Sequence, residues 1–452
     1  MILKRKIYEQ LKAWKNECNG SRAILVEGAR RIGKSTIVKE FAEHEYKSYI
    51  LIDFANASNT VMDAFKKYRN NFDELFMILS LEYGVKLFQR ESAIIFDEVQ
   101  LYPEARQLIK YLVADGRYDY IETGSLISIK ENVQNILIPS EERKLKMYPL
   151  DFEEFCWCFG ENLLTDYIKK CFQERKPLED DFHDKAMLLL KQYMLIGGMP
   201  KSVIAFIDGT RDFDRADQEK RDILNLYRDD ILKINTRYRS KVLSVFEQIP
   251  GFLSKHEKRI ILSKIAGGST IDQYTDTFFW LGNSMICNEC FLTRDPNIGL
   301  ALNEDRSYIK CYMGDTGLLV SHAFDENALT DSALYRQIMQ DKLSLNEGML
   351  YENVIAQMLT SNGHKLYFYT HYNEEKHRND IEIDFIISNN SKLKYKIYPI
   401  EVKSTKNYST SSLERFQNKY SSRIGECYVI HPKNLSVKNG ITYLPAYMAM
   451  CL

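Results

Sequence analysis

The chain has 452 residues, more than one ordinary hydrophobic core can organise, so we expect roughly two to four domains. Its 45% hydrophobic and 27% charged residues are ordinary for a globular protein, and its formal net charge of −1 excludes a global attraction to nucleic acid. Nine irregularly spaced cysteines and the lack of a membrane-spanning apolar run predict a cytoplasmic protein with reduced thiols and no membrane partner.

A strand, a glycine-rich turn and a helix are predicted between residues 23 and 41. Ala23–Val26 are apolar and predict a short buried strand. Residues 28–35, GARRIGKS, then match the P-loop pattern G-x-x-x-x-G-K-[ST] without a break, and a helix opens after them. This context favours a nucleotide-binding site over an ordinary glycine-rich turn.

The residue types of this segment suit a bound phosphate. Gly28 and Gly33 let the backbone curl until its N–H groups surround a phosphate, and the following helix adds the positive end of its dipole. Lys34 is predicted to reach the β- and γ-phosphates of ATP, and the Ser35 hydroxyl to ligate Mg²⁺. Thr36 completes the predicted cofactor-binding segment.

Further strands are predicted along the first 155 residues, alternating with helical segments such as residues 56–90. The predicted strands are Ser48–Asp53, Glu91–Asp97, Tyr118–Ser125 and Lys144–Leu150. Strands that alternate with helices predict a parallel α/β sheet with right-handed crossovers.

Polar residues stand where these strands end. Asp97 is predicted to hold the Mg²⁺ shell, and Glu98 to orient or deprotonate the attacking water. Thr123 or Ser125 could sense the γ-phosphate, or simply cap the next helix. Arg143 could act in trans on the nucleotide of a neighbouring subunit in an oligomer, or be solvated.

The middle of the chain is predicted to be helical and then winged. Residues 156–235 read mostly as helices, interrupted by a loop at Ile196–Pro200. A helix, a turn, a second helix and a hairpin are typical of a winged helix, and are predicted at Arg259–Ala266, Gly267–Gly268, Ile271–Leu281, Met285–Thr293 and Ser307–Met313.

The second of these helices is acidic. It carries Asp272 and Asp276 and no lysine or arginine, whereas Gln273 and Asn283 suit base contacts. This composition favours a structural or protein-docking role over reading of a DNA groove.

The last 110 residues place charges among apolar positions. Glu352 falls inside a predicted amphipathic helix at 346–359, where a carboxylate is unusual. Glu382 and Asp384 share one face of a predicted strand, and Glu401 and Lys403 share one face of the next.

An acid followed by E-x-K at the end of a strand is the arrangement of metal-dependent nucleases. Asp384 and Glu401 would hold one or two divalent ions, and Glu352 could add a carboxylate. Lys403 would position or deprotonate the attacking water. The alternative is a half-exposed hairpin with alternating charges.

These segments resemble a widespread group of prokaryotic AAA-type ATPases. In that group a P-loop domain is joined, through a helical and winged-helix region, to a C-terminal domain of unknown function that is similar to PD-(D/E)xK nucleases. The resemblance covers nearly the whole chain and rests on the stretches GARRIGKS, IIFDEVQ, ETGS, MYPLDFEEF, GGMP, LYRDDI, MGDTGLL, NEGMLYENVIA, IEIDF and PIEVKS.

The resemblance implies an α/β protein of four parts. They are an AAA-type P-loop NTPase domain with a parallel sheet at 1–155, a helical region at 156–235, a winged-helix-like region at 236–335 and a restriction-endonuclease-like α/β domain at 336–452.

The resemblance supports two sets of site residues. With ATP and Mg²⁺ as cofactors, the ATP site comprises Gly33, Lys34, Ser35, Asp97 and Glu98. The nuclease-like site comprises Glu352, Asp384, Glu401 and Lys403. One departure is that Glu142 precedes Arg143, where such proteins often have a glycine-arginine pair, which puts the arginine-finger role in doubt.

Two functions are compatible with these features. The first is an ATPase that couples nucleotide turnover to a nuclease-like module acting on DNA. The second is an ATP-switched module that binds a protein target and keeps an inactive nuclease-like scaffold. The complete carboxylate–lysine set favours the first, and the near-neutral charge and the acidic helix favour the second.

Overall fold

The computed structural model describes residues 2–125, 140–234, 236–255, 258–261, 271–325, 335, 339, 347–375, 377–389 and 396–452. The chain forms two compact units. Unit 1 comprises residues 1–148 with 283–285, and unit 2 comprises residues 149–282 with 286–452.

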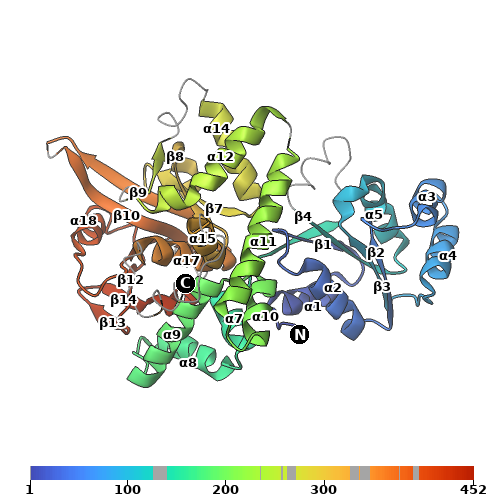
Figure 1. Cartoon of the computed structure of the whole chain (residues 1–452), viewed down its shortest axis with the longest axis horizontal. Coiled ribbons are helices and arrows are strands. Elements are labelled where there is room, and N and C mark those ends of the chain that lie inside the picture. The colour runs from blue at the N-terminus through green and yellow to red at the C-terminus, as the bar shows by residue number, and fades with distance from the viewer. Residues whose placement is uncertain are drawn as a thin grey trace. The chain divides into compact units, whose positions relative to one another are not determined.

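Unit 1 is built on a parallel five-stranded sheet (Figure 1). Its strands are β1 (Ala23–Gly28), β2 (Ser48–Asp53), β3 (Ser92–Asp97), β4 (Asp119–Ser125) and β5 (Glu142–Met147). Their order in the sheet is β2-β3-β4-β1-β5, and every neighbouring pair is parallel. The predicted parallel sheet is confirmed. The last strand ends at Met147 rather than Leu150, ahead of Pro149, whose nitrogen cannot donate to a sheet.

Helices surround this sheet. They are α1 (Ile7–Cys18), α2 (Lys34–Glu45), α3 (Asn59–Lys67), α4 (Phe72–Tyr83) and α5 (Pro103–Asp115), with a short 3-10 helix η1 (Val99–Leu101). Side chains of α3, α4 and α5 share a hydrophobic core with alternate residues of the strands, whereas α2 contacts β1 to β4. The prediction of helix over 56–90 is wrong after residue 83, because Gly84 adopts a left-handed conformation that ends α4.

Unit 2 begins with helices, as predicted for residues 156–235. They are α7 (Phe152–Cys158), α8 (Asn162–Glu174), α9 (Asp180–Ile196), α10 (Pro200–Asp208), α11 (Phe213–Leu232) and α12 (Thr236–Leu253). The predicted interruption falls between α9 and α10. Gly197 has φ +82° there, and a Cβ on it would lie 2.1 Å from the buried carboxylate of Asp315, so only glycine fits.

The rest of unit 2 is a mixed nine-stranded sheet with its helices. Its strands are β6 (Ile260–Ile261), β7 (Cys287–Thr293), β8 (Glu304–Met313), β9 (Leu366–Asn373), β10 (Arg378–Asn389), β11 (Lys396–Val402), β12 (Cys427–His431), β13 (Ser436–Lys438) and β14 (Ile441–Pro445). Their order in the sheet is β13-β14-β12-β11-β10-β9-β7-β8-β6. The helices are α14 (Ile271–Asn283), η3 (Leu300–Asn303), α15 (Thr316–Ala323), α17 (Glu347–Ser361), α18 (Ser411–Lys419) and η4 (Ala446–Cys451).

The predicted helix at 259–266 is wrong at residues 260 and 261. Two adjacent β-branched isoleucines pair there with β8 as strand β6. Residues 262–266 and the predicted turn at Gly267–Gly268 lie outside the described residues. The predicted hairpin is confirmed as β7 and β8, but β7 also pairs with β9, so these strands continue into the C-terminal part of the sheet.

All nine cysteines are free thiols, as predicted. Among the described residues, no helix combines the length and the apolar character that crossing a membrane requires.

Candidate functional site

The carboxyl ends of the unit 1 strands meet along one edge of the sheet. Gly28 at the end of β1 lies opposite Ser125 of β4 and Met147 of β5, and Asp97 at the end of β3 lies opposite Asp53 of β2. Ligands of open parallel sheets bind at this edge. The predicted P-loop and the predicted Asp97 therefore lie at the same edge.

The P-loop has the backbone geometry that its glycines predict. Gly33 has φ +92° where α2 begins, and a Cβ on Gly28 would lie 2.4 Å from the carbonyl oxygen of Met147. The Lys34 ammonium donates to the carbonyl oxygens of Gly28, at 3.2 Å, and Ala29, at 2.8 Å. Burial lowers the pKa of Lys34 to about 8, although Glu98 and Asp97 oppose the shift. The Lys34 ammonium thus lies against the loop that would enclose the phosphates.

Asp97 is the centre of a hydrogen-bonded group. Ser35 Oγ donates to Asp97 Oδ1 at 2.8 Å, and Thr123 Oγ1 donates to the same oxygen. Thr123 Oγ1 in turn accepts from the Glu98 backbone N–H at 3.3 Å, and the Gln100 amide donates to the Glu98 carboxylate. A hydroxyl beside a carboxylate is an oxygen donor set that fits Mg²⁺. Of the other predicted residues, Thr36 is exposed on α2 and Ser125 is half-buried at the end of β4.

Arg143 lies away from this edge. It pairs with Ile24 near the start of β5, and its guanidinium contacts Glu17 at 2.7 Å with 47% of the side chain exposed. Its role in a neighbouring subunit stays a prediction. Glu142 is instead buried, and the guanidinium of Arg106 donates to both of its carboxylate oxygens. The sequence shows no pattern that identifies this Arg106–Glu142 pair.

The four residues of the predicted nuclease-like site line one cavity in unit 2. The cavity has a volume of about 750 Å³, and all of Glu352, Asp384, Glu401 and Lys403 contribute to it. Glu352 comes from α17, Asp384 from β10 and Glu401 from β11, and Lys403 directly follows β11. Strands β10 and β11 are antiparallel neighbours with Phe385 opposite Ile400, so the predicted hairpin is confirmed. The remaining lining residues are Ser254, Lys255, Lys258, Arg378, Asn379, Asp380, Glu382, Val402, Ser409, Ser411, Ser412 and Arg415.

Helix α17 is held so that Glu352 faces this cavity. The next residue, Asn353, accepts from the Met313 backbone N–H at 2.7 Å and donates to the Met313 carbonyl at 3.1 Å. One turn later Gln357 accepts from the Thr316 backbone N–H at 2.8 Å. These buried bonds join the NEGMLYENVIA and MGDTGLL stretches and fix the register of the helix against β8.

Lysines accompany the carboxylates of the cavity. Glu352 forms an ion pair with Lys258 and accepts from the Tyr312 hydroxyl at 2.9 Å. Asp384 accepts from the backbone N–H of Val402 at 2.9 Å, and the Lys310 ammonium lies 3.4 Å from its other oxygen. Lys310 was visible in the sequence as a lone charge between apolar residues of a predicted strand. No pattern in the sequence pointed to Lys258.

Glu401 differs from the other two acids. Its Oε1 contacts Lys403 at 2.6 Å, but its Oε2 is buried and has no hydrogen-bond partner in the described structure. Burial raises the pKa of Glu401 to about 7; Asp384 and Glu382 add to the shift, and Lys403 opposes it. The Glu401 carboxyl could therefore accept a proton or a further partner near neutral pH.

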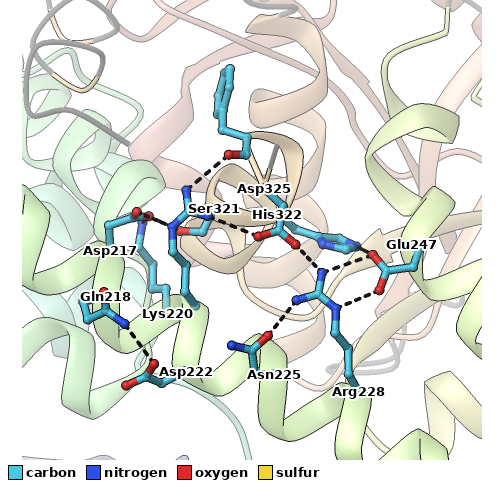
Figure 2. A network of polar contacts seen from close by, with 12 residues as sticks. Asp217, Gln218, Lys220, Asp222, Asn225, Arg228, Glu247, Ser321, His322 and Asp325 are labelled. Atoms are coloured by element: carbon cyan, nitrogen blue, oxygen red, sulfur yellow. Dashed lines mark hydrogen bonds and ion pairs between the residues drawn. The ribbon is translucent and has the colours of Figure 1, made fainter. Parts of the chain in front are cut away.

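A shared metal site of three carboxylates does not fit this arrangement. Among the described residues, the one group of three potential ligands with atoms all within 4.8 Å of one another is Glu247, His322 and Asp325, away from the cavity. In that group, Arg228 donates to Glu247 at 2.7 Å and forms an ion pair with Asp325 (Figure 2). The guanidinium thus already provides the positive charge that a metal ion would bring. Glu352, Asp384 and Glu401 do not meet the same condition.

Three family models match parts of the chain. Residues 20–156 match an AAA domain, residues 187–328 a domain of unknown function (DUF8612), and residues 347–448 a second domain of unknown function (DUF4143). A similar solved structure is the Walker-type ATPase PABY2304 of Pyrococcus abyssi, with 16% identity and a TM-score of 0.40, covering 71% of this chain and 96% of that chain. No curated protein sequence matches the chain. Residues 20–156 therefore form an AAA-type P-loop domain.

The charge of Lys403 should set the pKa of Glu401. Replacing the ammonium with an uncharged side chain, Lys403→Met, removes the nearest stabilising charge, so the pKa of Glu401 should rise above 7; Lys403→Arg should leave it near 7. Carboxyl ¹³C NMR of glutamate-labelled protein, with the signal assigned by Glu401→Gln, measures both. An unchanged pKa in Lys403→Met would show that the ion pair does not control this carboxyl.

Proposed function

We propose that this protein is an ATP-switched module, in which ATP binding and hydrolysis at the P-loop control the binding of a protein target by the C-terminal unit. The observation that carries the ATPase half is the meeting of Lys34, Ser35, Asp97 and Glu98 at one sheet edge. The match of residues 20–156 to an AAA domain supports it.

The residues of the edge suit distinct steps of ATP hydrolysis. Lys34 would exchange its two carbonyl acceptors for oxygens of the β- and γ-phosphates. Ser35 and Asp97 would hold Mg²⁺, which neutralises phosphate charge when bound. Glu98 would orient or deprotonate the attacking water. Thr123 contacts both acidic residues, since its hydroxyl donates to the Asp97 carboxylate and accepts from the Glu98 backbone N–H.

The contacts in the C-terminal cavity favour the binding role over cleavage. Glu352, Asp384 and Glu401 each lie beside a lysine, which supplies the positive charge that a catalytic metal would bring. The near-neutral charge of the whole chain also gives no general attraction to DNA.

A second candidate function is divalent-dependent cleavage of DNA coupled to ATP turnover. The unpartnered Oε2 of Glu401 beside Lys403 is the observation that favours it, because a metal ion could bind to that carboxylate oxygen.

Arg143 concerns the ATP site rather than DNA cleavage. In an oligomer, its guanidinium would act on the nucleotide of a neighbouring subunit.

Substitutions at the P-loop edge test the ATPase. Lys34→Ala should abolish ATP binding, because the phosphates lose their side-chain cation. Glu98→Gln should bind ATP yet hydrolyse it roughly 100-fold more slowly, because the metal ligand remains while the water loses its base. Equilibrium binding of a fluorescent ATP analogue and phosphate release measure the two effects.

The exposed lysine of the same helix provides the control for these variants. Lys39→Ala should bind and hydrolyse ATP like the wild type, since Lys39 is exposed and forms an ion pair with Glu43 at the surface. Equal hydrolysis by the wild type and Glu98→Gln would remove Glu98 from its catalytic role.

A plasmid assay separates the two candidate functions. With ATP and Mn²⁺, the wild type should leave supercoiled DNA uncut, because lysines already neutralise the carboxylates of the cavity. Nicking that disappears in Asp384→Ala and in Lys403→Ala, with ATP hydrolysis retained in both, would instead establish the cleavage function and refute the binding role.

A further inference from the structure

A lysine lies between two acids behind the C-terminal cavity. The Lys310 ammonium, on β8, is 3.4 Å from Asp384 Oδ1 and 3.9 Å from Glu352 Oε2. Its side chain is only 3% exposed, and it also lies 5.3 Å from the centre of the Phe368 ring. An ammonium in this position is screened from water by packed side chains.

The oxygens of the two acids already have partners. Glu352 Oε1 pairs with Lys258, and Oε2 accepts from Tyr312. Asp384 Oδ2 accepts from the Val402 backbone, and Oδ1 faces Lys310. A divalent ion could bind both acids only by displacing Lys310, because two cations cannot share this space without strong repulsion.

We propose that Lys310 is a built-in cation that takes the place of a divalent metal ion between Asp384 and Glu352. The proposal rests on the proposed function, in which the C-terminal cavity binds rather than cleaves. It also explains a disagreement: the residues resemble a metal-dependent nuclease site, but their arrangement leaves no shared position for the metal.

The electrostatics of the site agree with this role. Two carboxylates at short range and largely removed from water repel one another unless a positive charge lies between them. Burial lowers the pKa of Lys310, but the carboxylates of Glu352 and Asp384 outweigh burial and hold that pKa above its usual range. Lys310 is therefore charged whenever the two acids are ionised.

Two lysines that line the cavity beside these acids, Lys258 and Lys403, have a different geometry. Within the part of the chain that the structure describes, Lys258 forms an ion pair with Glu352 alone and Lys403 with Glu401 alone. Removing Lys258 leaves the ammonium of Lys310 between the two acids. Lys258→Met is therefore the matched control for Lys310→Met.

Mn²⁺ binding to the full chain without nucleotide tests the proposal. Every protein carries Asp97→Asn, so that the P-loop edge does not contribute. The parent and Lys258→Met should show no Mn²⁺ binding that depends on Asp384, whereas Lys310→Met should bind Mn²⁺ at least tenfold more tightly than the parent. Adding Asp384→Asn to Lys310→Met should abolish the gain. Isothermal titration calorimetry, with electron paramagnetic resonance of free Mn²⁺, measures these affinities.

Two results would overturn the proposal. One is a parent protein whose Mn²⁺ binding is lost on Asp384→Asn, and the other is a folded Lys310→Met that binds Mn²⁺ no better than the parent. If Lys310→Met is too unstable for titration, Mn²⁺ should raise its melting temperature and not that of Lys258→Met, and the lack of such a shift would equally refute the role. Because no nucleotide is used, failure of ATP hydrolysis would refute the proposed function without affecting this test.

Discussion

A carboxylate that is removed from water needs hydrogen-bond donors or a positive charge beside it. Which of these partners it has decides whether it can still bind a metal ion. Asp97 accepts hydrogen bonds from two neutral hydroxyls, Ser35 and Thr123, which satisfy it without cancelling its charge. Asp384 faces the ammonium of Lys310, which cancels that charge. The first arrangement leaves an acid that can take up Mg²⁺, and the second leaves an acid whose counter-ion is part of the protein.

The same constraint explains residues that take no part in chemistry. The carboxylate of Glu142 is buried against Arg106. In unit 2, Asp217 is buried and contacts Arg221 at 2.7 Å, close to the Arg228 network of Figure 2. Breaking such a pair leaves one uncompensated buried charge, which costs about 3–5 kcal/mol. The Arg106–Glu142 pair joins α5 to β5, and the Asp217–Arg221 pair lies within α11.

How much the sequence could predict differed between the units. The P-loop is a continuous motif whose geometry follows from its own residues, so Gly28, Gly33 and Lys34 were placed correctly on the edge where β1 ends. The β10–β11 hairpin was also predictable, because alternating charges and apolar residues put Asp384 and Glu401 on one side. This alternating pattern therefore accounts for Asp384, Glu401 and Lys403, whereas Glu352 comes to the cavity from helix α17.

What the sequence could not predict depends on contacts between distant segments. Ile260 and Ile261 form a strand because β8 offers them an edge, which no local pattern reveals. Lys258 reaches Glu352 and Arg106 reaches Glu142 only in the folded chain. The partners of a carboxylate, and hence its capacity to hold a metal, were set by these distant residues rather than by the E-x-K motif itself.

Anomalous diffraction from crystals grown with Mn²⁺ and a non-hydrolysable ATP analogue tests most directly the distinction between the two acids. We expect a manganese peak beside Ser35 and Asp97 and none between Asp384 and Glu352, where Lys310 should remain in place. A manganese ion bound to Asp384 in the wild-type protein, with Lys310 displaced, would contradict it.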